Sequence, residues 1–553
     1  MKSTSICLFL FALVFLSCNS SNHPTASLVI TNARIWTGNV AEPWAEAMAV
    51  NADTIVFVGD EASCKKFISD STEVVDAGSQ LIVPGFIDSH VHFLDGGYSL
   101  QTVQLRDVSS KKEFIERIAV YAKSLPQGAW ITAGIWNHQN WGGELPEVSW
   151  IDSVTPNNPV WLNRIDGHMG LANSLALKTA GITNDTKNIP GGEIIRDKNG
   201  NITGIFKDNA QSLISKKIAV PPYSIQEKAM DAAMKLFASK GITSIQNMGY
   251  DWVEQEVFKK THDEGKLTLR IYSNMPLSDW ARLRDEVKNH GNGDKWLKIG
   301  GLKGYVDGSL GSHTAAMMEP FSDKPTDKGL LVSNPDSLFY YVKNADSNGL
   351  QVMVHAIGDR AIKTQLDIYD TVQKINGPRD RRFRIEHLQH ILPDDIKRVA
   401  ALNVIASMEP YHAIDDGVWA EKYIGVTRAR TTYAFKSLED AGVTLAFGSD
   451  WFVAPPSPLE GIYAAVTRRT LDGKNPDGWI PEQKISVEQA LRAYTWGAAF
   501  ASFDENIKGT LEPGKLADFV ILQEDLFKMA AEKIKDVKVV ATYVGGKKVY
   551  GQK

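Results

Sequence analysis

Eight short apolar segments, spread between residues 80 and 450, constrain the fold more than any other feature of the chain. Apolar runs of this length, bounded by turn residues, predict buried strands. From the second segment onward they alternate with stretches that can each hold a helix, which predicts an α/β fold made of β/α units. Eight such units form a (β/α)8 TIM-type barrel, whose reactive groups lie at the C-terminal ends of the strands. The segments are QLIVPGFIDSHVH, GITSIQNMG, LTLRIYSN, LKIGGLKGYVDG, LQVMVHAIGD, RFRIEHLQH, NVIASMEP and VTLAFGSD.

Both ends of the chain have a different pattern, with short alternating strands and turns. Residues 27–80 and 505–553 are therefore predicted to build one small composite β-sandwich domain, which leaves 81–504 for the barrel. The gap from about 93 to 240 is far longer than one crossover helix. Long ordered insertions are usually functional, so this one is predicted to be a subdomain that covers the substrate.

The first residues have the pattern of a targeting segment, in which Lys2 precedes an apolar run that ends near Cys18. The stretch VFLSCNSS resembles a bacterial lipoprotein signal, so residues 1–18 are expected to be a signal peptide that is cut before Cys18. Lipidation of Cys18 would then anchor an exported protein to a membrane, facing the periplasm or the cell surface, with 19–26 as a tether. Ordinary signal cleavage, or retention of the segment as an anchor, is the alternative.

Composition limits the classes of partner. The net charge of −5 and the mixing of acidic with basic residues leave no basic stripe for a nucleic-acid backbone. We expect a small-molecule substrate and membrane contact through the lipid alone, with a homo-oligomer left open. After signal removal and lipidation only Cys64 remains, so folding should not require a disulfide.

A histidine pair, His90 and His92, marks the end of the first predicted strand. Side chains two residues apart on a strand share one face, and in a barrel that face points to the axis. Two neutral imidazoles so placed suit a divalent ion such as zinc. Ligand-type residues also end other predicted strands, which favours a metal centre over unrelated histidines. These residues are Lys303, His355, His387 and Asp450.

Several motifs, in order, extend this pattern into a family resemblance. PGFIDSHVHF, GLKGYVDGSLGSHTA, VHAIGDRAI, RIEHLQH, FGSDWFV and GTLEPGKLADFVIL resemble amidohydrolase family 3 of the amidohydrolase superfamily, over about residues 28–549. The resemblance implies that His90, His92 and Asp450 hold one metal, that His355 and His387 hold a second, and that Lys303 bridges them as a carbamate.

Each implied role has an alternative. A lysine can form a carbamate only where burial or a metal favours its neutral amine, and Lys303 could instead pair with Asp307 inside the barrel. Asp450 is expected to accept a proton from metal-activated water and pass it to a leaving nitrogen, or else to serve only as a helix N-cap. His390, three residues beyond His387, is expected to lie behind the ligands.

Substrate contacts are expected from the insertion and from one glycine-rich loop. Arg164 could bind a substrate carboxylate through two hydrogen bonds, or pair with Asp166 as scaffold. His313 could meet substrate or lie at the surface. The candidates are Arg164, Asp166, His168, Asn173 and His313.

The expected activity is hydrolysis of a non-peptide carbon–nitrogen bond, in an amide, N-acyl, N-formyl or cyclic amide compound. The expected cofactor is one or two divalent ions, with zinc as the first choice. A deaminase or an esterase on the same site is the alternative within enzymes, because the fold does not fix the substrate. A lipid-anchored binding protein without turnover, and a phosphoesterase on a histidine-rich barrel, are the alternatives from other classes.

Overall fold

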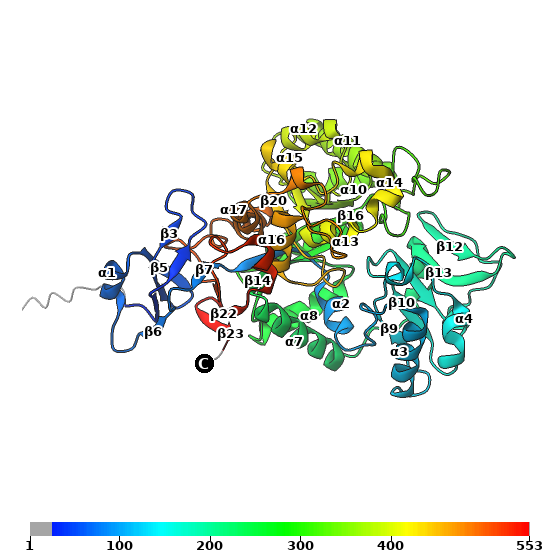
Figure 1. Ribbon diagram of the computed structural model, residues 1–553, viewed down its shortest axis with the longest axis horizontal. Helices are drawn as coiled ribbons and strands as arrows, with labels where there is room; N and C mark the ends of the chain where they lie inside the picture. The colour runs from blue at the N-terminus through cyan, green and yellow to red at the C-terminus, as the bar shows by residue number, and fades with distance from the viewer. Residues whose placement is uncertain (1–24, 552–553) are drawn as a thin grey trace, which may run out of the picture.

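The computed structural model describes residues 25–551, and its centre is an eight-stranded parallel barrel sheet (Figure 1). All eight predicted strands are present, and they follow one another around the sheet in chain order. They are β8 (Phe86–Val91), β14 (Ile242–Met248), β15 (Arg270–Pro276), β16 (Leu297–Tyr305), β17 (Gln351–Ala356), β18 (Arg384–His387), β19 (Ile405–Met408) and β20 (Leu445–Phe447).

The barrel is completed just beyond the ends of β20 and β8. The Asp450 N–H donates to the His90 carbonyl at 2.7 Å, and the His92 N–H donates to the Trp451 carbonyl at 2.7 Å. Closure therefore places the histidine pair of the first strand against the aspartate that follows the last one.

Helices cover the outside of the barrel, and α11 (Asp359–Asn376) shows why these segments are helical. Its buried residues Ile362, Leu366 and Tyr369 recur at helical spacing and form one apolar face. The helix ends at Gly377, which has a positive φ of 77° that glycine adopts at little cost. The other helices that connect successive strands are α8 (Trp252–Asp263), α9 (Trp280–His290), α10 (Pro335–Ser347), α12 (Pro393–Ala401), α13 (Pro410–Asp416), α14 (Ala420–Ala429) and α15 (Phe435–Asp440).

The insertion after the first strand has its own five-stranded sheet, in the order β12-β13-β11-β10-β9. It is shorter than the expected span of 93–240, because α2 (Phe93–Ser99) and α7 (Tyr223–Ser239) pack on each other in the barrel core. The bounds of its main elements are α3 (Lys111–Lys123), β9 (Ile131–Thr132), β10 (Val160–Asn163), β11 (Met169–Ala172), α5 (Ser174–Ala180), β12 (Gly192–Arg196) and β13 (Ile202–Asp208).

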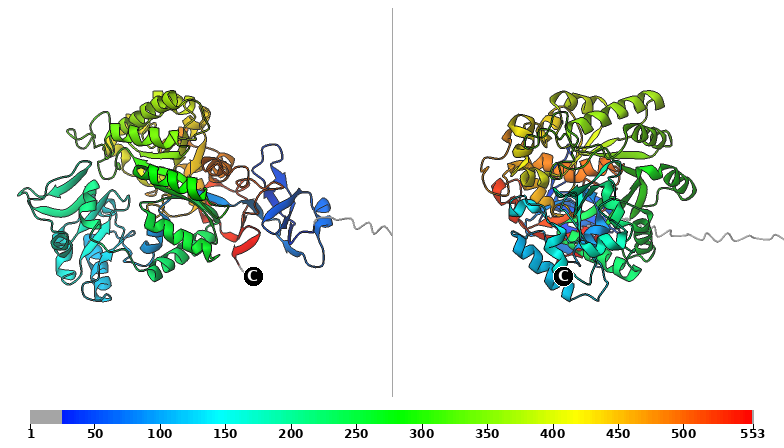
Figure 2. Two further views of the ribbon diagram at one scale, coloured as in Figure 1. Left: turned by 180° about the vertical axis from the view of Figure 1, so that it is seen from behind. Right: turned by 90° about the vertical axis from the view of Figure 1, so that its right-hand side faces the viewer.

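Two small sheets built from both chain ends lie at the other end of the molecule from the insertion (Figure 2). One has the order β5-β4-β1-β6 and the other β23-β22-β21-β7-β2-β3, and they share an apolar core. The strands are β1 (Leu28–Thr31), β2 (Arg34–Trp36), β3 (Trp44–Ala45), β4 (Ala47–Asn51), β5 (Thr54–Gly59), β6 (Glu73–Asp76), β7 (Leu81–Pro84), β21 (Phe519–Leu522), β22 (Val539–Val544) and β23 (Lys547–Tyr550).

The chain passes from the small sheets into the barrel at Gly85. Strand β7 pairs with β2 and β21, so residues 81–84 belong to the small sheet and not to the barrel that was expected to begin at 81. A Cβ at Gly85 would lie 2.2 Å from Thr243 Oγ1, so only glycine fits this junction without displacing its neighbour.

Among residues 25–551 no helix is both long and apolar enough to span a membrane. The predicted signal peptide, Cys18 and most of the predicted tether lie outside the described residues.

Candidate metal centre

Three predicted ligands meet where the barrel closes. Asp450 Oδ1 lies 3.3 Å from His92 Nε2 and 3.6 Å from His90 Nε2, and one ligand atom from each residue lies within 4.8 Å of the other two. All three side chains are nearly or fully buried. Two imidazoles and a carboxylate in this arrangement are a donor set that suits zinc.

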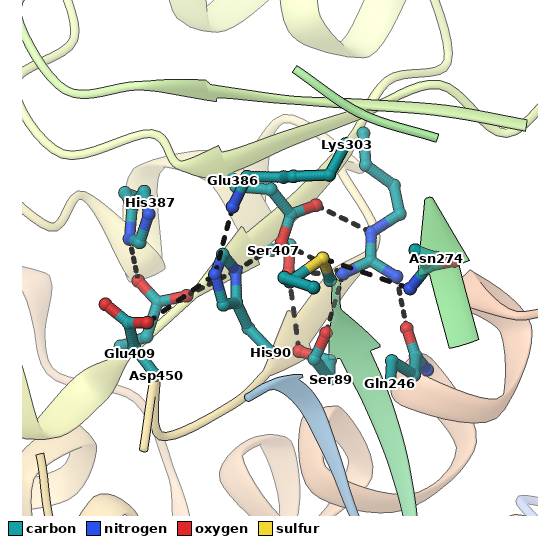
Figure 3. Close-up of polar contacts among 12 residues, drawn as sticks. Ser89, His90, Gln246, Asn274, Lys303, Glu386, His387, Ser407, Glu409 and Asp450 are labelled. Carbon is teal, nitrogen blue, oxygen red and sulfur yellow. Dashed lines mark hydrogen bonds and ion pairs between the residues drawn. The ribbon is translucent and has the colours of Figure 1, made fainter. Parts of the chain in front are cut away.

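Each imidazole of the pair is oriented by a second contact on its Nδ1. His90 Nδ1 lies 2.7 Å from Glu386 Oε2 (Figure 3). His92 Nδ1 lies 3.0 Å from the Met248 carbonyl. A ring that donates through Nδ1 presents the lone pair of Nε2, which is the usual way in which proteins orient a histidine ligand. Burial, with the nearby charge of Lys303, holds the pKa of His90 well below its usual value, so this ring is neutral.

His355 lies near the C-terminal end of β17, and His387 is the last residue of β18. Their ring centroids are 4.6 Å apart. His387 Nδ1 lies 2.7 Å from Glu409 Oε2, and His355 Nε2 lies 3.0 Å from the Gly308 carbonyl. His387 also lies beside His90, with ring centroids 4.8 Å apart. The structure thus brings all four predicted histidines into one cluster.

Lys303 points into this cluster, with Nζ 3.1 Å from His90 Nε2. Burial lowers the pKa of Lys303 to about 8, against the charges of Glu386 and Asp450, which raise it. A neutral amine is thus accessible near neutral pH, as carbamate formation requires. Among the described residues no ion pair joins Lys303 to Asp307, whose carboxylate instead accepts three N–H groups, from Ala316, Ile357 and Gly358.

The cluster fits a cation because it contains buried oxygens without partners. Asp450 Oδ1 and Glu409 Oε1 are both buried and neither accepts a hydrogen bond. A buried carboxylate oxygen without a partner is costly, and a divalent ion removes that cost. The residues present are therefore compatible with the metal that the family pattern implies.

Asp450 is held in an uncommon backbone conformation, with φ of 55°. The preceding Ser449 donates from its N–H and its hydroxyl to the carboxylate of Asp88, at 2.9 and 2.5 Å. Burial raises the pKa of Asp450, but the nearby imidazoles of His92 and His387 lower it to a net value of about 2. The next helix, α16 (Pro458–Thr467), is capped by Ser457, so Asp450 is not its N-cap.

The centre opens into a cavity of about 200 Å³ between the barrel and the insertion. One wall is mainly apolar and comes from the barrel. The other wall is polar and comes from the insertion. The lining includes Tyr250, Tyr305, Val332, Phe452 and Val453 on the first side, and Asp166, His168, Asp208, Asn209 and Gln211 on the second.

Asp166 and His168 are the predicted contact residues that reach this cavity and the smaller one beside it. His168 Nδ1 lies 2.7 Å from Asp208 Oδ1, and its ring centroid is 5.0 Å from that of His355. Arg164 forms an ion pair with Asp166 and is almost fully buried. Arg164 therefore pairs with Asp166 as part of the scaffold, which is the second of its two predicted roles. Its side chain also lines the smaller cavity.

The structure does not bring the other two candidates to the centre. The Asn173 amide caps α5 and bonds to the backbone of Val160, Thr155 and Asn158, so its polar atoms are already used. His313 pairs with Asp323 at 3.0 Å and packs against Tyr423. In the part of the chain that the structure describes, neither Asn173 nor His313 lines either of the two cavities.

Sequence reasoning missed several residues at the centre. Glu409 directly follows β19, and Asp450 lies three residues after the end of β20. A search for ligand-type residues at the ends of predicted strands could therefore have found Glu409. Glu386 precedes His387 and would be expected on the opposite face; only the fold shows that it reaches His90. His412 and Asp208 carried no recognisable signal.

A parallel barrel with buried histidines, a lysine and an aspartate at its C-terminal rim defines a metal-dependent hydrolase. The amidohydrolase family model matches residues 73–550. The chain belongs to this family, amidohydrolase family 3, and is an amidohydrolase.

Individual proteins are similar to this chain over most of its length. The chain is 41% identical to protein LONG AFTER FAR-RED 3 of Arabidopsis thaliana, over 95% of this chain and 92% of that protein. It is 27% identical to the N-substituted formamide deformylase of Arthrobacter pascens, over 94% and 97% of the two chains. An uncharacterised metal-dependent hydrolase from Pyrococcus horikoshii has a similar structure, with a TM-score of 0.74 and 27% identity, over 91% and 99% of the two chains.

Proposed function

We propose that this amidohydrolase cleaves a non-peptide carbon–nitrogen bond in an N-acyl, N-formyl or cyclic amide. The observation that carries the proposal is the convergence of His90, His92, Lys303 and Asp450 on one buried point beside a cavity. The similarity to an enzyme named for deformylation of N-substituted formamides supports an amide substrate over an ester.

We assign zinc to this centre, one or two ions per chain, with Lys303 as a carbamate. His90, His92 and Asp450 would hold the first ion, and His355 and His387 would contribute to the second. When bound, such an ion supplies Lewis acidity, which lowers the pKa of water and polarises a carbonyl.

Asp450 is the proposed proton carrier. Its pKa of about 2 keeps the carboxylate ionised at neutral pH, so it can accept a proton from the attacking water. Its Oδ1 accepts no hydrogen bond within the described protein and the side chain borders the cavity, so the same carboxyl group can then protonate the leaving nitrogen.

The two walls of the cavity suit a substrate with one apolar and one polar end. Tyr250, Tyr305 and Phe452 offer apolar contact, whereas His168 offers a hydrogen-bond donor. A hydrogen-bonded polar end discriminates against analogues that lack it, because a buried group would then lose its partner.

The test is a substrate panel with the zinc-loaded full chain. N-formyl amines, N-acyl amines and cyclic amides are compared with matched esters and with aminated heterocycles, and the product is assayed as amine, acid or ammonia. Turnover of an amide with release of amine and acid supports the proposal. Turnover of esters alone, or ammonia release alone, contradicts it in favour of the esterase or the deaminase.

We also propose that the chain is exported and held at a membrane by lipid on Cys18, from the pattern of its first residues. Metabolic labelling with a radioactive fatty acid tests this, with Cys18→Ser as the variant that should lose the label.

A further inference from the structure

Two residues outside the ligand set described above, Glu409 and His412, lie beside His387. Glu409 follows β19 directly, and His412 lies in the first turn of α13, so both extend from the same rim of the barrel as His387 at the end of β18. One ligand atom from each of the three lies within 4.8 Å of the other two. Figure 3 shows Glu409 between His387 and His90.

Both residues keep one buried atom without a partner. Glu409 is 0% exposed, and while its Oε2 lies 2.7 Å from His387 Nδ1, its Oε1 forms no hydrogen bond. His412 Nε2 is also buried and forms no hydrogen bond. The two atoms do not bond to each other, so both are left without compensation for the loss of water.

Charge around these atoms favours a cation. The carboxylates of Glu409 and Glu386 both lie beside His90 Nδ1, at 3.6 and 2.7 Å, so acidic groups gather next to the atoms without partners. Two imidazoles and a carboxylate are ligands that borderline divalent ions prefer.

We propose that His387, Glu409 and His412 form a second divalent-cation site, so that the second ion of the centre takes Glu409 and His412 as ligands. This inference rests on the proposed metal-dependent function and deepens it. The ion would be of the zinc type, held by these three side chains.

The competing explanation is that Glu409 only orients His387 through their hydrogen bond. His412 separates the two accounts. Its ring lies nearly parallel to that of His387, at 14° and 6.4 Å between centroids, and no hydrogen bond joins the two rings. A role in orientation therefore gives His412 no effect on metal binding.

The experiment loads the full chain with zinc and bicarbonate, removes free metal by gel filtration, and measures bound zinc per chain by plasma mass spectrometry. Chelator competition then gives the affinity of each ion. The variants are His412→Ala, His412→Gln, which keeps more of the volume, and Glu409→Gln, which keeps the shape and removes the charge. His390→Ala is the matched control, because His390 Nε2 is another buried imidazole nitrogen without a partner and lies outside this group.

We expect substitutions at His412 and Glu409 to weaken the binding of one of the two zinc ions and to leave the other unchanged. Variants at His412 and Glu409 lose the second equivalent of zinc, or bind it at least tenfold more weakly, while they keep the first. The control keeps both, and thermal melting shows that each variant is folded.

Other outcomes overturn the inference in distinguishable ways. If folded His412 variants bind both ions with wild-type affinity, Glu409 and His412 do not form a site together, even where Glu409→Gln weakens binding. A wild-type chain that binds one ion, unaffected by either substitution, also overturns it and leaves the proposed function standing. A wild-type chain that binds no zinc contradicts both proposals.

Discussion

Arg384 holds both carboxylate oxygens of Glu386, with Nε 2.8 Å from Oε1 and Nη2 3.0 Å from Oε2. All of these atoms belong to fully buried side chains. Glu386 in turn accepts a hydrogen bond from His90 Nδ1 at 2.7 Å, so a chain of polar contacts runs from inside the barrel to the metal centre. The guanidinium fixes the orientation of the carboxylate, and the carboxylate fixes the ring of His90.

Replacement of Glu386 by Gln is expected to weaken zinc binding about 10- to 100-fold, since the ring of His90 loses its charged acceptor. Chelator competition measures this effect. Glu505→Gln is a suitable control, because Glu505 pairs with Arg382 away from the centre. Unchanged affinity in a folded Glu386→Gln variant would mean that His90 needs no carboxylate to orient it.

Replacement of Asp450 by Asn is expected to lower kcat about 10²- to 10⁴-fold, because the proton carrier is lost. Zinc content must be measured on the same preparation, since Asp450 also lies within reach of the ion. A variant that keeps its zinc and at least a tenth of the wild-type kcat contradicts the proposed role.

The His168–Asp208 pair should make stability depend on pH. Burial lowers the pKa of His168, but the hydrogen bond and charge of Asp208 raise it to a net value above the usual 6.5. The protonated pair therefore stabilises the fold fully below pH 6.5, and this contribution is lost as the pH rises through the folded pKa.

Thermal melting from pH 6 to pH 9 tests this expectation with Asp208→Asn, which keeps the shape of the side chain and removes its charge. The melting temperature of the wild type should exceed that of the variant most at pH 6, and this difference should shrink as the pH rises. A difference that is constant across this range contradicts the assignment.

The junction at Gly85 should tolerate no side chain. Gly85→Ala places a Cβ 2.2 Å from Thr243 Oγ1, and we expect a loss of about 1–3 kcal/mol in the free energy of unfolding. Urea unfolding measures it, and Thr243→Ala in the same chain should recover part of the loss. Equal stability of Gly85→Ala and wild type would show that the junction can widen freely.

The barrel could be predicted because its signals are local. Each strand is a mainly apolar run, as in residues 350–356. His90, His92, His355, His387 and Asp450 each lie within three residues of a strand end. Parallel strands around a barrel bring such ends to one rim, so the cluster follows from the topology.

Contacts that depend on tertiary packing could not be predicted in this way. Asn173 is a candidate for substrate contact in the sequence, yet its amide caps a helix, because the fold of the insertion surrounds it with the backbone groups of Thr155, Asn158 and Val160. The contact of Glu386 with His90 joins strands 296 residues apart, and no pattern in either segment indicates it. The sequence predicts α7 as part of the insertion, because the chain leaves the barrel and returns within one continuous gap.

The most direct test of the central claim is the dependence of turnover on metal. The full chain is stripped with chelator and then restored with zinc and bicarbonate, and hydrolysis of the best amide substrate is followed with bound zinc measured in parallel. We predict that activity disappears with the metal and returns with one or two zinc ions per chain. Full activity in a chain that holds no metal would contradict the account.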